Sequence, residues 1–458
     1  MVSPLDRKLL RDLWRIKGQA AAIALVIALG VLLLVMMDGL VNTLDETRKA
    51  YYQRYRLADV FVPVKRAPDN VLRQLRGIEG VTFVEGRVTG DALITLPNIA
   101  IPLRALAVSL PDNREPTLNN IVLTRGRMLN ARHADEILLL DSFAAARNLV
   151  PGDTLVATMN GTRRQFDIVG LAQSPEFLYT TAPGELVPDD GRFAVIWMSQ
   201  TALAAVYDMQ GAFNEALLAT SRTARLPAIL AQTDNIVQRY GGLGAYGLED
   251  QASNRLITEE ISGLRASAVG VPPVFLAVAA FLLYIVISRM VQSEREQIGL
   301  LKAFGYSSQE VSGHYLKLVI VIATAGAIAG SLLGIASGRS MALFYQNYFK
   351  FPFIVFQLDP QAFVIGFLVS IVTASLGGLM VLRTVFKLTP AVAMRPAAPA
   401  DYSKSGNVLV RVNHWFDQPS RMVLRRILRQ PGRMIAAVTG IATGMALSVG
   451  MISVLSGF

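Results

Sequence analysis

Five long apolar runs without Asp, Glu, Lys or Arg constrain this chain more than any other feature. A helix of about 20 residues crosses about 30 Å of hydrocarbon, so uncharged runs of this length predict membrane-spanning helices. One run alone could be a buried helix of a soluble protein. Five runs in a 458-residue chain with only 17% charged residues favour a membrane protein. The predicted spans are residues 19–37, 266–288, 318–338, 361–382 and 434–458.

The net charge of +10 comes largely from basic clusters beside these runs. Such clusters precede the first and fifth spans and follow the fourth, as expected when Lys and Arg are retained in the cytoplasm. The charge is therefore explained by membrane topology, and we expect no nucleic-acid partner. The pattern predicts a cytoplasmic N-terminal segment 1–18, an external segment 38–265, a cytoplasmic segment 289–317, an external loop 339–360 and a cytoplasmic linker 383–433.

The external segment 38–265 has the pattern of a folded α+β domain. Stretches such as "TFVEGRVTGDALITLP" alternate apolar and polar residues, as strands do. Asn160-Gly161 joins two such stretches and favours a two-residue hairpin turn. Ser142 is expected to cap a short helix. Helical stretches at both ends are expected to continue the first two spans outward as stalks. The fold predicted is an α-helical transmembrane bundle with a large external α+β domain mounted on stalk helices from the first two spans.

The loop 339–360 is dense in Phe and Tyr. Aromatic side chains favour the headgroup zone of a bilayer, so a short interfacial helix is expected here. A substrate-binding aromatic cluster is the alternative interpretation.

The last predicted span resembles the first. Residues 10–37 and 424–451 are identical at eleven of 28 positions at an offset of 414, including the basic prelude and a glycine. This similarity indicates an internal duplication. Segment 434–458 would then begin a second copy of the first half, and the native chain would continue beyond Phe458.

The sequence contains few motifs typical of catalysis, nucleotide binding or metal binding. The sequence has no G-x-x-x-x-G-K-[ST] motif for binding nucleotide phosphates, no cysteine, and three histidines that lie far apart. Gly242–Gly247 spells G-x-G-x-x-G but follows a predicted helix rather than a strand, which favours a glycine turn. The sequence therefore predicts no catalytic, cofactor-binding or metal-ligating residue. The spans also contain no ionisable group of the kind that ion-coupled transporters use.

Glycines recur every four residues in the third span. Small residues at this spacing let two helices approach closely. The stripe predicts a helix-packing seam, either within the chain or between two copies of it; its residues are Gly326, Gly330 and Gly334.

The cytoplasmic stretch "SEREQIGLLKAFGYSSQEV" (293–311) is the most ordered piece of local sequence. Gly305 is expected to end one helix, and Ser307 or Ser308 to cap the next, with Glu310 in its first turn. On the first helix, Ile298, Leu301 and Phe304 fall on one side. This segment could be an interfacial loop, or an apolar knob that inserts into a groove on a partner. The candidate partner-contacting residues are Glu294, Arg295, Glu296, Ile298, Gly299, Leu300, Leu301, Lys302, Phe304 and Gly305.

This stretch resembles the coupling segment of FtsX/MacB-like ABC transporter permeases, with the approximate pattern S-x-R-x-x-E-I-G-[LI]-L-[RK]-A-[LF]-G. Gln297 stands where that pattern usually has Glu, and an acidic residue lies one position earlier. "EILLLDSFAAARNLVPGDTLVATMNGTRRQFDIVGLA" is similar to the external domain of the same family, and "LTPAVAMRP" to the tail after its fourth span. The resemblance covers residues 1 to about 396, and the duplication resembles the longer family members with two permease halves.

The resemblance implies a permease subunit in the bacterial cytoplasmic (inner) membrane. A separate cytoplasmic ABC ATPase, expected as a dimer, would bind ATP and dock on the coupling segment. Its hydrolysis cycle would move the external domain by mechanotransmission, for export or extraction of a lipid-phase or periplasmic substrate. Membrane lipid and an external substrate or accessory protein are the other expected partners. The alternative function is a regulatory membrane protein that activates a cell-wall hydrolase or senses an external ligand.

The missing phosphate-binding motif gives a first testable prediction. The purified chain should hydrolyse no ATP unaided, because it has no loop that could hold the nucleotide phosphates. The measurement is phosphate release by the detergent-purified chain, with a known ATPase as positive control. Hydrolysis that stays with the chain through repeated purification would contradict this interpretation.

Overall fold

The computed structural model describes residues 4–97, 99, 101–180, 189–357 and 360–387, together with 438, 442 and 445. The chain divides into two compact units. The helical unit comprises residues 1–36, 267–336 and 359–458, and the external unit comprises 37–266 and 337–358. Apart from residues 438, 442 and 445, the expected fifth span and the duplicated segment lie outside the described residues, as does most of the linker after the fourth span.

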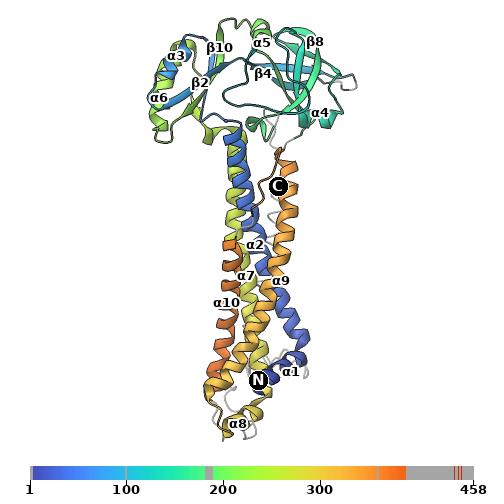
Figure 1. The fold of residues 1–458 in the computed structure, drawn as a ribbon, viewed down its shortest axis with the longest axis vertical. Helices are drawn as coiled ribbons and strands as arrows, with labels where there is room; N and C mark the ends of the chain where they lie inside the picture. Colours follow the sequence, from blue (N-terminus) through green and yellow to red (C-terminus); the bar gives the residue numbers. More distant parts are fainter. Residues whose placement is uncertain are drawn as a thin grey trace, which may run out of the picture. The chain divides into compact units, whose positions relative to one another are not determined.

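Within the described residues, six helices contribute to the helical unit, and Figure 1 shows their arrangement. Two short ones, α1 (Pro4–Arg15) and α8 (Arg295–Ala303), accompany four long ones: α2 (Lys17–Arg54), α7 (Ala252–Ser293), α9 (Ser308–Tyr348) and α10 (Pro360–Lys387). Within the described residues, these four long helices are long and apolar enough to cross a membrane, and they contain the first four predicted spans. One apolar core joins them, with Ile27, Leu283 and Leu318 among its fully buried residues.

The glycine stripe of α9 is a seam within the chain. A side chain at Gly330 would meet the backbone of Ala28 and the side chain of Val31 on α2, and side chains at Gly326 and Gly334 would also meet α2. The absence of side chains therefore lets the two helix backbones pack at short range. Of the two interpretations offered by the sequence, packing within the chain is the one the structure shows, because α2 occupies the stripe.

Helices α2, α7 and α9 all extend into the external unit. There they share a second core in which Leu44, Ile257 and Ala342 are buried. The prediction of a separate interfacial helix within 339–360 is wrong, because residues 339–348 contain no Gly or Pro and α9 continues to Tyr348. Phe349 and Phe351, just after it, are buried, and the centroids of the Phe351 and Tyr51 rings lie 6.2 Å apart in an edge-to-face arrangement.

The first sheet of the external unit has four antiparallel strands in the order β11-β1-β10-β2. These strands are β1 (Val60–Pro68), β2 (Val81–Arg87), β10 (Ala212–Thr220) and β11 (Tyr246–Gly247). Helices α3 (Val71–Arg76) and α6 (Leu226–Val237) pack together against this sheet (Figure 1). Val62, Leu75 and Ile229 are buried between the helices and the sheet.

The second sheet closes on itself. Its order is β5-β8-β6-β9-β4-β3-β7, and β7 also pairs with β8, so six strands form a barrel with β5 attached to β8. Trp197, Phe143 and Phe166 fill its interior. The short helices α4 (Asp141–Arg147) and α5 (Gln200–Val206) follow two of its strands. The strands are β3 (Thr89–Thr95), β4 (Leu103–Leu110), β5 (Val122–Gly126), β6 (Glu136–Leu140), β7 (Thr154–Met159), β8 (Thr162–Gln173) and β9 (Phe193–Ser199).

The sequence-based prediction of the Asn160-Gly161 hairpin turn is confirmed, whereas the prediction of a helix cap at Ser142 is wrong. Asn160 and Gly161 have φ of 48° and 76°, and Met159 pairs with Thr162, which is the expected two-residue hairpin. Ser142, however, lies inside α4 rather than at its cap, because the helix already begins at Asp141. The acidic residue one position earlier takes the first helical position, where it complements the helix dipole.

A buried charge cluster joins the two sheets. Arg87 ends β2, and its guanidinium donates to both carboxylate oxygens of Glu176, just after β8, and at 2.8 Å to Glu215 on β10. The Asn119 amide also donates to Glu176, at 2.8 Å. Burial raises the pKa of Glu215, and the Arg87 charge opposes that shift. The cluster holds the four-stranded sheet and the barrel in one arrangement.

Glu136 at the start of β6 gives a pH prediction for the external unit. Hydrogen bonds from Arg127, opposed by burial and aided by the Asn130 backbone and His133, lower its pKa to about 2 from the ordinary 4.5. Because the pKa of Glu136 is lowered in the folded state, its ionised carboxylate stabilises the fold above pH 4.5. This contribution is lost as the pH falls towards 2. Glu136→Gln should therefore flatten the acid limb of the stability profile.

The measurement is the melting midpoint of the external unit within the full chain between pH 2 and 6. Asp135→Asn, one residue away, is the matched control. An unchanged acid limb in Glu136→Gln would show that the bonds around Glu136 do not stabilise the fold.

Candidate coupling site

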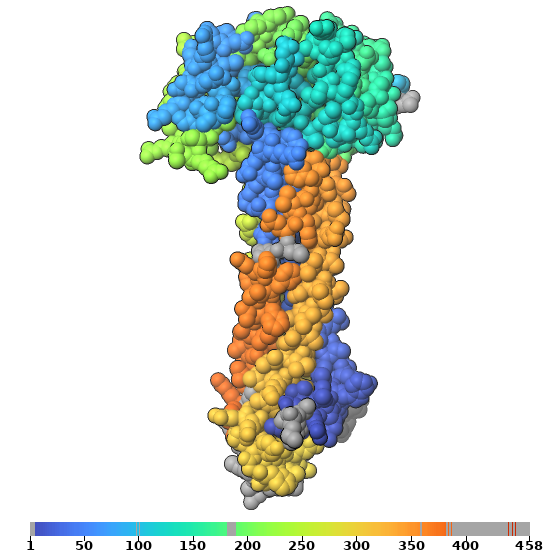
Figure 2. Space-filling view, in the orientation of Figure 1, coloured from blue at the N-terminus to red at the C-terminus, as the bar shows by residue number. Residues whose placement is uncertain are grey.

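Helix α8 forms the short connection between α7 and α9. Glu294 interrupts the helical path between α7 and α8, and Gly305, with φ of 95°, ends the connection in a conformation that glycine adopts readily. Ser307 accepts from the Glu310 backbone at 3.2 Å, and the Glu310 carboxylate accepts from the Ser307 backbone at 2.8 Å. This reciprocal capping box starts α9 as the sequence predicted. Figure 2 shows α8 and its turn, in yellow, at one end of the helical unit.

The burial of α8 divides the candidate residues differently from the sequence interpretation. Ile298 and Gly299 are buried in the helical core, and Leu301 packs against it. Leu300 is 52% exposed and Phe304 is 75% exposed. Ile298, Leu301 and Phe304 therefore do not form one partner-facing side as expected, because Ile298 and Leu301 pack in the chain's own core. Glu296 and Gly305 are exposed, Arg295 and Lys302 are half-buried, and partial burial lowers the pKa of Lys302.

Glu294 is only 2% exposed and is the hub of a buried network. Its carboxylate accepts from the Lys8 ammonium at 2.8 Å, from the Arg15 guanidinium, and from the Tyr315 hydroxyl at 3.0 Å. Lys8 and Arg15 lie on α1, and Tyr315 lies on the first part of α9. One carboxylate thus links the α7–α8 junction to both neighbouring helices.

Asp12 extends this network. It is 3% exposed, pairs with Lys8 on its own helix, and lies 3.1 Å from the Nε2 atom of His314 on α9. Two carboxylates and two cations therefore share one site, so the cluster is balanced when His314 is neutral. A buried carboxylate is tolerated only when it is paired and hydrogen-bonded, and both conditions are met here.

The sequence interpretation included Glu294 but missed its partners, namely Lys8, Asp12, Arg15, His314 and Tyr315. One signal was available: Asp12 is an acidic residue inside a strongly basic segment. The pairing itself joins residues about 280 to 300 positions apart in sequence. Such distant pairs have no local signature.

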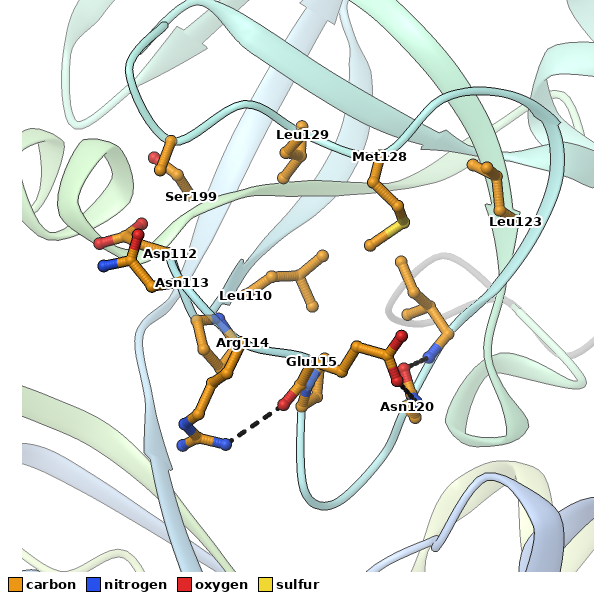
Figure 3. Close-up of a pocket in the computed structure, with 14 residues that line it drawn as sticks. Leu110, Asp112, Asn113, Arg114, Glu115, Asn120, Leu123, Met128, Leu129 and Ser199 are labelled. Carbon is orange, nitrogen blue, oxygen red and sulfur yellow. Dashed lines mark hydrogen bonds between the residues drawn. The ribbon is translucent and has the colours of Figure 1, made fainter.

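The external unit holds a separate cavity of about 410 Å³ (Figure 3). Leu110, Leu123, Met128 and Leu129 contribute its apolar wall. The charged Arg114 at its rim already bonds to Glu85 and Thr117, each at 2.8 Å. The Arg114 guanidinium is thus engaged by neighbouring protein groups.

Each of the two described histidines lies beside one carboxylate. His133 lies 2.8 Å from Glu136 and His314 pairs with Asp12, while His414 lies outside the described residues. Across the part of the chain that the structure describes, no group of three or more His, Asp and Glu side chains could hold a metal ion.

Comparison with known proteins assigns both units. Residues 20–236 match the family model "MacB-like periplasmic core domain", and residues 270–390 match "FtsX-like permease C-terminal". This chain belongs to the FtsX/MacB-like family of ABC transporter permeases. No curated protein matches it significantly. Family membership makes it a membrane-spanning permease with an external, periplasmic domain, which supports a location in the inner membrane.

Two solved structures are similar to parts of this permease. The periplasmic region of MacB from Actinobacillus actinomycetemcomitans is 9% identical, with a TM-score of 0.29, and the match covers 46% of this chain and 95% of that one. The extracellular domain of the noncanonic ABC-type transporter YknZ from Gram-positive bacteria is 8% identical, with a TM-score of 0.27, and the match covers 42% and 98%.

The network predicts a large effect of Glu294→Gln on this permease. The amide removes the negative charge that Lys8 and Arg15 share, and breaking a buried ion pair costs roughly 3 kcal/mol. The melting midpoint of the detergent-purified chain should fall clearly. Glu296→Gln, an exposed substitution of the same kind on α8, should leave it unchanged. Equal midpoints for both variants would show that the network contributes nothing to stability.

Proposed function

We propose that this permease transmits force made by a separate ABC ATPase, which docks on the outer face of α8, to its external domain. The observation that carries the proposal is an exposed apolar pair, Leu300 on α8 and Phe304 at the C-cap of this helix, whose other face is fixed in the core. Residues four apart in a helix stand one above the other. The pair therefore forms a short apolar ridge, flanked by exposed Glu296, of the kind that inserts into a groove.

Movement of α8 would pass to the long helices. Ile298 and Leu301 pack in the core that contains α7 and α9, and Glu294 ties the α7–α8 junction to α1 and α9. Helices α7 and α9 are 42 and 41 residues long and contribute residues to both units. A displacement imposed on α8 would thus be carried along two continuous helices rather than through a flexible linker.

The proposal includes an orientation and a class of substrate. The basic segments favour a cytoplasmic position for the N-terminus, α1 and α8, where an ATPase would have access to them. The apolar runs carry no charged residue, which does not suit a water-filled path through the spans. We therefore favour export or extraction of a periplasmic or lipid-phase substrate by movement of the external domain.

The test replaces the apolar ridge by charge. Leu300→Asp with Phe304→Asp should weaken association with the ATPase roughly tenfold or more, since exposed apolar anchors often dominate an interface. Gly299 and Leu301 are unsuitable for this purpose, because substitution there would also disturb the core. The measurement is ATP hydrolysis and a nucleotide-binding subunit that co-purify with the tagged chain from its own cells.

Gln309→Asp, an exposed change at the start of α9, is the control and should keep the ATPase bound. Undiminished co-purification with the double variant would sink the docking surface. Recovery of a cell-wall hydrolase on the external domain, together with the ATPase, would instead favour a regulatory role driven by the same movement.

A further inference from the structure

Helix α1 has two faces of different kinds. Its inner face contributes Leu9 and Asp12 to the core and the buried network. Its outer face carries Leu10, which is 66% exposed, and Trp14, which is 72% exposed, together with exposed Arg7 and Arg11. Dark-blue atoms of the N-terminal segment are visible on the face drawn in Figure 2. A solvated face would not place its tryptophan and a leucine outward while burying an aspartate.

The charge of the outer face is uniformly positive. Asp6, at its edge, bonds to Lys317 at 3.0 Å, and Asp12 is turned into the core. Within the described part of the chain, no ion pair joins Arg7 or Arg11 to an acidic residue. The Lys17 ammonium lies 4.7 Å from the centre of the Trp14 ring. An apolar, aromatic and cationic surface of this kind is complementary to an anionic interface.

The position of α1 in the chain selects the partner. The helix ends at Arg15, α2 begins at Lys17, and the first uncharged apolar run begins at residue 19. A helix attached so closely to a membrane span lies within reach of the headgroup zone, where tryptophan rings and cationic side chains gather. We propose that the outer face of α1 binds the headgroups of anionic phospholipids in the adjoining leaflet.

Lipid binding at this face would act on the coupling site. The same helix holds Glu294 through Lys8 and Arg15, so a lipid-bound α1 fixes the α7–α8 junction relative to the membrane surface. This consequence rests on the proposed function of α8. The binding of anionic lipid does not, because it follows from the composition and exposure of α1 alone.

The experiment measures lipid contact at Trp14 without an ATPase. The full chain is reconstituted in vesicles of phosphatidylcholine and phosphatidylglycerol in equal amounts, with bromine, a quencher of tryptophan fluorescence, on one lipid or the other. The signal of Trp14 is the difference between wild type and Trp14→Phe. We expect stronger quenching by brominated phosphatidylglycerol, and loss of that excess in Arg7→Gln with Arg11→Gln, since each cation favours an anionic surface.

Arg66→Gln with Arg73→Gln removes the same charge from exposed sites in the external unit and should keep the excess quenching. Salt should reduce the excess in wild type, because the attraction is screened. Equal quenching by both lipids would overturn the anionic preference. If neither lipid quenched the Trp14 fluorescence, the proposed lipid contact would be wrong. This would remain so if an added ABC ATPase changed the Trp14 fluorescence, because the face would then contact a protein. Neither result would bear on docking at Leu300 and Phe304.

Discussion

The buried carboxylate of Glu294 is the interaction on which the arrangement of the helical unit depends most. It lies where α7 gives way to α8, and it accepts from two cations on α1 and a hydroxyl on α9. In a medium of low polarity such a charge is costly unless every partner is in place. The need to pair this carboxylate therefore constrains α1, the α7–α8 junction and the start of α9 together. As a result, α8 keeps one face in the core and leaves the other exposed.

Away from Glu294, the long helices are held together by close packing of their backbones. Apolar side chains gain little by leaving lipid for another apolar surface, so close backbone contact must provide the attraction. The glycine stripe of α9 provides it against α2, and Gly377 provides it between α10 and the backbone of Ala280 on α7. The external unit repeats the use of buried charge at a junction, because Arg87, Glu176 and Glu215 join the four-stranded sheet to the barrel. In both units, buried charge pairs connect elements whose other contacts are mainly apolar: α1, α8 and α9 in one unit, and the sheet and the barrel in the other.

If the two proposals hold, the two faces of α1 would let the membrane surface influence the coupling site. Its inner face belongs to the charge network, and its outer face has the composition of a membrane-surface helix. Force applied to α8 by an ATPase would be resisted at the same junction that α1 holds. The response of the permease would then depend on the lipid as well as on the nucleotide.

Sequence by itself determined the features governed by local physics. Span length follows from bilayer thickness, the Asn160-Gly161 hairpin from backbone conformation, and the start of α9 from the reciprocal bonds of Ser307 and Glu310. The family resemblance, carried by contiguous motifs, was likewise confirmed. Only the tertiary structure decided which face of α8 is free, what the glycine stripe packs against, and which cations neutralise Glu294. These depend on contacts between residues hundreds of positions apart, and a helical pattern shows that a face exists without showing what covers it.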